Sequence, residues 1–170
     1  MQSLITTHPL IDFCDRARAI FTSSDYFSSV LYDTVKAEIQ IGTKALSSQT
    51  NTRDYALSIY QSLEEQPYEP SDSPQMQGIQ FFKGYVYIDF LRKINHKDSN
   101  IWDETLKYSW TGLLELQENA DDILDLNTYF FKLDKWFLFV PEGQRDKDPV
   151  LTAIRVARIE INYQHNYTAY

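Results

Sequence analysis

The spacing of apolar residues between Ile123 and Val140 constrains the fold more than any other feature of this chain. Six of them recur at alternating steps of three and four: Ile123, Leu126, Phe130, Leu133, Phe137 and Val140. Such a stripe is typical of a helix that packs one face against its neighbours. We therefore expect a helix here, which Asn127-Thr128 could bend or divide. The short segment 136–140 is β-prone, yet it lies on the same stripe.

Similar spacing recurs along the chain, and few glycines or prolines interrupt it. The five glycines and six prolines fall mostly between the periodic segments, as in helical proteins. The other predicted helices begin near His8-Pro9, Ser24-Asp25, Thr52, Ser73-Pro74, Trp102 and Asp148-Pro149. We expect an all-α fold of six or seven antiparallel helices, arranged as a helical bundle or a short solenoid.

Length and composition indicate one soluble domain that spans residues 1–170. The net charge of −8 favours a basic protein partner and disfavours nucleic acid, and self-association is the alternative to a different partner. We see no signal peptide and no apolar run long enough to cross a membrane, so we expect a cytoplasmic protein. The single cysteine, Cys14, is expected to be a small core residue.

Small residues at helical spacing suggest a repeat. Ala56, Tyr60 and Leu63 precede Pro67, and the next predicted helix carries Gly84. Together with the small residues of the following helix, the stretch 54–116 resembles a tetratricopeptide repeat. That resemblance implies a groove for a peptide or a partner helix. The alternative is a non-repeating bundle in which the small residues are incidental.

The groups that catalysis or metal binding requires are sparse. None of His8, His96 and His165 has the spacing of a zinc site, and there is no glycine-rich phosphate loop. We therefore expect no metal and no cofactor.

One pair of residues supports an enzymatic alternative. Arg158 and His165 are seven residues apart, which is two turns of a helix, so both would lie on one helical face. The pair, followed by Tyr167, resembles the Arg-x(4–6)-His motif of HEPN ribonucleases. That resemblance implies a ribonuclease or toxin–antitoxin component, in which Arg158 stabilises negative charge and His165 transfers a proton.

Aromatic residues point to the leading hypothesis. Rings cover more than one face of two predicted helices, and a single buried face cannot hide them all. Aromatic side chains are enriched at interface hot spots. We therefore expect a non-catalytic adaptor or acidic inhibitor that binds a protein through an aromatic-lined helical surface. The residues expected to bind the partner are Phe81, Tyr85, Tyr87, Tyr129, Phe131 and Trp136.

Overall fold

The computed structural model combines three described helices with a mixed β-sheet. It describes residues 8–27, 37–41, 55–61, 69–70, 79–95, 101–125, 128–139 and 150–166. The helices are α1 (Pro9–Ser23), α3 (Ile101–Glu118) and α4 (Ala120–Ile123). The strands are β1 (Ala37–Ile41), β2 (Tyr55–Gln61), β3 (Glu69–Pro70), β4 (Ile79–Asn95), β5 (Thr128–Phe139) and β6 (Val150–Asn166).

Two long strands form the centre of the sheet. The strand order is β1-β2-β4-β6-β5, and β3 extends the sheet beside β4. Strands β4 and β6 pair antiparallel over their whole length, from Ile79 opposite Asn166 to Asn95 opposite Val150. Among the described strands, only β1 and β2 run parallel. Valine, isoleucine, tyrosine and phenylalanine dominate β4, and these residues suit a pleated surface.

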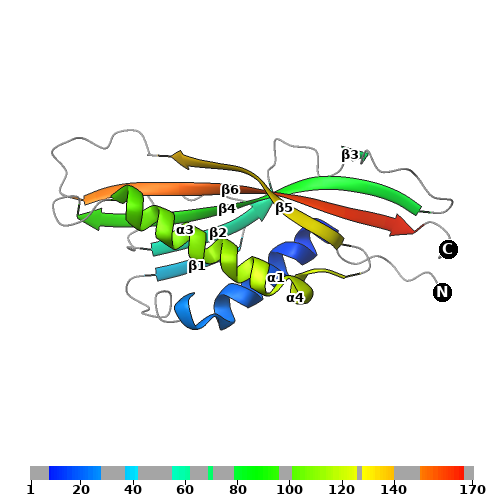
Figure 1. Ribbon diagram of the computed structural model, residues 1–170, viewed down its shortest axis with the longest axis horizontal. Coiled ribbons are helices and arrows are strands. Elements are labelled where there is room, and N and C mark those ends of the chain that lie inside the picture. The colour runs from blue at the N-terminus through cyan, green and yellow to red at the C-terminus, as the bar shows by residue number, and fades with distance from the viewer. Residues whose placement is uncertain are drawn as a thin grey trace.

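The helices α1 and α3 lie on one face of the sheet (Figure 1). That face buries alternate residues of β4, namely Val86, Ile88 and Phe90, beside Ile159 and Ile161 of β6. This period of two is that of a strand packed on a hydrophobic core. We call the opposite face of the sheet the outer face.

Gly112 lets α3 approach the sheet closely. A Cβ atom at this position would lie 2.3 Å from Cε1 of Phe90 and 3.3 Å from Cζ of Phe27. The ring of Phe90 also meets Tyr108 edge-on, with ring centroids 5.6 Å apart. The missing side chain therefore makes room for an aromatic ring between α3 and β4.

Helix α1 begins where the sequence predicts. The His8 side chain caps it by accepting a hydrogen bond from the Leu10 N–H at 3.2 Å, and Pro9 occupies the first turn. Its buried face includes Cys14, which is a core residue as expected. Arg16 then ties α1 to the segment between α4 and β5 through an ion pair with Asp125 at 2.8 Å.

The outer face is partly buried at one end. Leu91, Ile154 and Val156 form a small second cluster there, against which Tyr87 packs. Tyr87 stacks on Tyr60, whose hydroxyl donates a hydrogen bond to Asp89 at 3.0 Å. Burial of the phenol, together with the Asp89 carboxylate, raises the pKa of Tyr60 above its ordinary value of 10.0.

The all-α prediction is wrong, both as a helical bundle and as a solenoid. The segments expected to be the third, fourth and last helices are the strands β2, β4 and β6, and most of the sixth is α4 followed by β5. Strands β4 and β6, which were predicted as the fourth and last helices, bury side chains on both faces, so their apolar residues are nearly continuous. A continuous apolar run fits helical spacing by chance, and period alone cannot distinguish the two structures.

Both family resemblances are wrong as well. The stretch 54–116 contains the strands β2, β3 and β4 before α3, so it is not a tetratricopeptide helix pair. Gly84 lies within β4, opposite Ile161. The segment with Arg158 and His165 is strand β6, which removes the helical face on which the HEPN resemblance rested.

No helix in the described part of the chain has the length and hydropathy needed to cross a membrane.

Candidate binding surface

Exposed apolar side chains concentrate on two neighbouring elements. Among the described residues, nine large hydrophobic side chains are exposed, and seven of them belong to α3 or β5. Scattered exposed apolar residues are normal, whereas a contiguous group marks an interaction site. The seven are Leu106, Trp110 and Leu114 of α3, with Tyr129, Phe130, Leu133 and Phe137 of β5.

The register of β5 divides these residues between two faces. Leu133 pairs with Ile159, a core residue, so it lies on the helix side of the sheet. Phe130 and Phe137 pair with Asn162 and Val156, on the outer face. A bulge between Leu133 and Lys135 shifts the alternation, and a second one follows Thr128. One strand thus presents large apolar side chains on both faces.

The helix-side surface consists of Leu106, Trp110, Leu114, Leu133 and Trp136. The three residues of α3 are spaced by four, so they form one ridge along the helix. Trp110, which is 51% exposed, stacks on Trp136 with ring centroids 5.9 Å apart and planes inclined by 10°. The stack joins the α3 ridge to the edge strand of the sheet.

A cation borders this surface. The guanidinium carbon of Arg155 lies 5.3 Å from the centroid of the Trp136 ring, a cation–π distance. Burial lowers the pKa of Arg155, although an arginine stays protonated at neutral pH. Trp136 Nε1 and Arg155 Nε are buried without a hydrogen-bond partner among the described residues. Such unsatisfied donors are uncommon in folded proteins.

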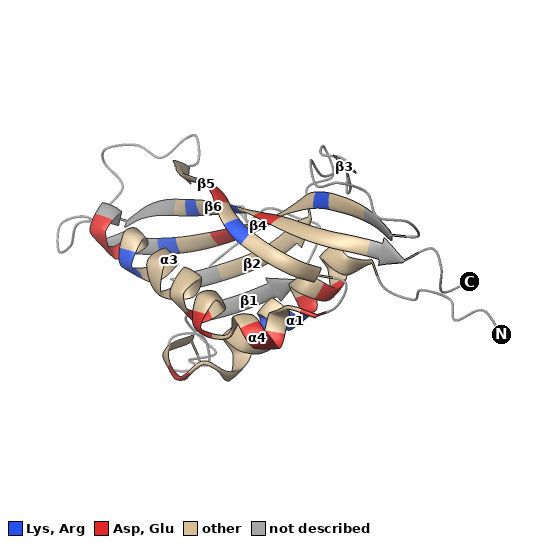
Figure 2. Cartoon of the chain, turned by 45° about the vertical axis from the view of Figure 1, so that its right-hand side comes forward, with Lys and Arg blue, Asp and Glu red and all other residues tan. Residues whose placement is uncertain are grey.

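Charge is divided between the two layers. Figure 2 shows Asp and Glu gathered on the helices and Lys and Arg on the long strands. The helical segments 8–27 and 101–125 hold ten acidic and three basic residues, a formal charge of −7. Strands β4, β5 and β6 hold seven basic and three acidic residues, a formal charge of +4. The residues around the helix-side surface are therefore mainly acidic. The net charge of the whole chain does not show where on the molecule this acidic area lies.

The six aromatic residues predicted to bind a partner all lie on strands, and they divide between the two faces. Phe81, Tyr85 and Tyr87 alternate along β4 on its outer face, and Tyr129 meets Phe81 edge-on with ring centroids 5.8 Å apart. The other two, Phe131 and Trp136, lie on the helix side.

Phe131 and Trp136 have different surroundings. Phe131 packs against the core and meets Phe13 of α1 at 5.5 Å. Trp136 belongs to the helix-side surface. The sequence-based set thus combines a core residue, a helix-side residue and four outer-face residues.

Arg158 and His165 do not form the predicted pair on one helix. Seven residues of strand place their backbones roughly 23 Å apart. Arg158 lies on the outer face, with its guanidinium carbon 3.7 Å from the Tyr85 ring centroid and Nη1 3.4 Å from an Asp134 carboxylate oxygen. The backbone of His165 pairs with Gln80 of β4.

No group of three His, Cys, Asp or Glu side chains in the described ranges could hold a metal ion. His8 caps α1, its ring lies against Tyr163, and burial lowers its pKa. His96 lies outside the described residues.

The α3 ridge was not among the surfaces predicted from the sequence. The spacing of four from Leu106 to Leu114 is a second apolar stripe, beside the buried one that includes Tyr108 and Leu116. A helix that packs against one sheet needs only one apolar stripe. The presence of two stripes in the sequence was therefore the signal that one of them is left for a partner.

The chain matches no protein-family model, and no curated protein shows significant sequence similarity to it.

Proposed function

We propose that this protein is a non-catalytic binding module that docks a protein partner on its helix-side surface. The observation that carries the proposal is the exposed Trp110–Trp136 stack, flanked by Leu106, Leu114 and Leu133. Tryptophan dominates interface hot spots because one ring buries a large area at low entropic cost. Arg155 beside the stack adds a second residue type that is enriched at such sites.

The partner has an apolar centre and a basic rim. The helical layer around the ridge is acidic, so a basic rim would complement it and an acidic rim would be repelled. Asp103 and Glu104 lie at one end of the ridge, and Glu118 and Asp121 lie at the other. The ridge residues are spaced by four, so they can pack between the rows of side chains on an amphipathic helix of the partner.

Strand addition at the β5 edge is disfavoured. Lys132, Asp134 and Lys135 occupy the middle of this edge strand, and a bulge follows Leu133. Charged side chains and bulges are the devices by which proteins prevent edge-to-edge pairing. The partner therefore contacts side chains of the surface and does not extend the sheet.

Selection of random displayed peptides on the immobilised full chain tests the proposal. Enriched peptides should carry apolar anchors at helical spacing with flanking Lys or Arg, and Trp110→Ala should weaken their binding at least tenfold. The matched control is Tyr26→Ala, which removes an exposed ring just beyond the end of α1. Acidic peptides, or binding insensitive to Trp110→Ala, would contradict the proposal. A concentration-dependent dimer in sedimentation, lost in Trp110→Ala, would identify a second copy as the occupant.

A further inference from the structure

The outer side of β5 combines exposed rings with cations. Its outward residues, in order, are Tyr129, Phe130, Lys132, Asp134, Lys135 and Phe137. Phe130 is 47% exposed and Phe137 is 46% exposed. Two lysines thus lie between two exposed aromatic positions on one face of one strand.

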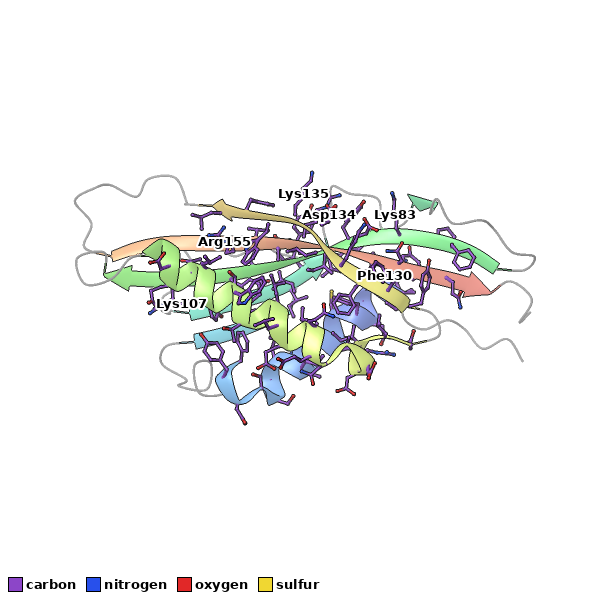
Figure 3. The ribbon with its side chains drawn as sticks, viewed as in Figure 1. Lys83, Lys107, Phe130, Asp134, Lys135 and Arg155 are labelled. Atoms are coloured by element: carbon purple, nitrogen blue, oxygen red, sulfur yellow. The ribbon has the colours of Figure 1, made fainter. Side chains whose placement is uncertain are left out.

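A third lysine joins them from β4. Lys83 pairs with Asn162 of β6, and Asn162 pairs with Phe130. Two strand steps separate the backbones of Lys83 and Phe130, roughly 10 Å. Figure 3 shows Lys83, Asp134 and Lys135 on the side of the strands away from α1 and α3.

The carboxylates of this area are already neutralised. Glu160 lies 3.6 Å from Lys132 Nζ and accepts a hydrogen bond from Asn162 at 3.1 Å. Asp134 lies 3.4 Å from Arg158. Lys83 lies opposite Glu69 in the register of β3 and β4, and Lys135 makes no ion pair within 4.0 Å with the side chains that the structure describes. Counted with Glu69, the carboxylates of this area are one fewer than the cations Lys83, Lys132, Lys135 and Arg158, so a positive charge of about one is left for a ligand.

The acidic helices do not cancel this local field. The acidic helices lie on the other face of the sheet (Figure 2), roughly 10 Å away by ordinary packing distances. The Debye length at physiological ionic strength is about 8 Å, so charges at that distance are largely screened. The acidic helices therefore do not exclude nucleic acid from this face.

We propose that the outer face of β5, with Lys83, binds single-stranded nucleic acid. Exposed rings provide stacking platforms for unpaired bases, and lysines contact the phosphates between them. The strand from Tyr129 to Phe137 spans roughly 26 Å, enough for a short single-stranded site of about four nucleotides. A duplex keeps its bases stacked inside, so the rings would gain nothing from it. This function is independent of the helix-side surface.

Fluorescence anisotropy with a labelled twelve-nucleotide oligo(dT) tests the proposal on the full chain. Phe130→Ala should weaken binding about tenfold, in line with the loss of one base–ring stack. Lys135→Gln should weaken binding and reduce the slope of log K against log salt by about 0.7. Lys107→Gln makes the same charge change on an exposed lysine of α3, and it should alter neither the affinity nor the salt slope.

Four results would overturn the proposal. One is no binding by the wild-type chain at low salt, and another is an equal loss in Lys107→Gln and Lys135→Gln. The third is binding of oligo-glutamate as tight as that of oligo(dT), which would assign the face to an acidic polypeptide. Phe130→Leu retains apolar bulk without a ring, so an unchanged affinity in that variant would also contradict base stacking.

Discussion

Trp110 of α3 and Trp136 of β5 stack almost parallel, 5.9 Å apart, on the surface of the molecule. The stack fixes the α3 ridge against the edge strand and leaves half of the Trp110 side chain exposed. A folded chain gains little from keeping such a ring in water, because burying it would be more favourable. This relationship is the reason for placing the partner on the helix side.

Gly112→Ala should destabilise the protein although alanine favours helices. The new methyl group would clash with the Phe90 ring, because its carbon would lie 2.3 Å from the Cε1 atom of that ring. Overpacking of this kind costs about 1–3 kcal/mol, which exceeds the gain in helix propensity of about 1 kcal/mol. Urea unfolding would measure the difference. The exposed position Gln117→Ala is the control, and a more stable Gly112→Ala protein would refute the close packing of α3 on β4.

Asp125→Ala should lower the free energy of unfolding by about 1–2 kcal/mol. The Asp125 carboxylate pairs with Arg16 at 2.8 Å and accepts a hydrogen bond from the Thr128 N–H at 2.6 Å. Asp125→Asn retains an acceptor without the charge, so it should lose less. Thermal unfolding distinguishes these variants from Asp122→Ala, an exposed carboxylate nearby that should have little effect.

Tyr60 should make the protein less stable as the pH rises above about 10. Its folded pKa is raised by burial and by Asp89, whereas the unfolded phenol ionises near its ordinary value of 10.0. The unfolded state therefore releases a proton that the folded state retains, and stability falls as pH increases through this window. Tyr60→Phe should be less stable at neutral pH and show a shallower decline above pH 10. If stability fell equally steeply with pH in the wild type and in Tyr60→Phe, the raised pKa of Tyr60 would be contradicted.

Cys14 should be unreactive in the folded protein. Burial raises the pKa of its thiol to about 12, and Asp15 adds to the shift, so the reactive thiolate is scarce at pH 8. Ellman's reagent should label the chain only after denaturation. Rapid labelling of the native protein would show that the buried face of α1, on which Cys14 lies, is open to solvent.

Sequence patterns predicted the parts of the fold whose signals are local. His8-Pro9 marked the start of α1, and the segment 101–118 was recognised as a helix. The first depends on a proline and a cap, and the second on apolar residues at helical spacing, and all of these signals are read from neighbouring residues.

The strands were not predictable from apolar spacing alone. In β4, the residues Val86, Ile88 and Phe90 face the core while Tyr87 and Leu91 are covered on the outer face. The run therefore lacks the clean alternation of a half-buried strand. Its richness in β-branched and aromatic residues was the signal that favoured a strand. The binding surfaces depend on the sheet register, which requires the fold itself.

The affinity of one selected basic peptide for two single variants tests the central claim most directly, since the claim assigns the protein partner to the helix side. Trp110→Ala should weaken the peptide at least tenfold, whereas Phe130→Ala, which removes an equally exposed ring from the outer face, should change its affinity less than twofold. Equal losses in the two variants, or a loss confined to Phe130→Ala, would contradict the assignment.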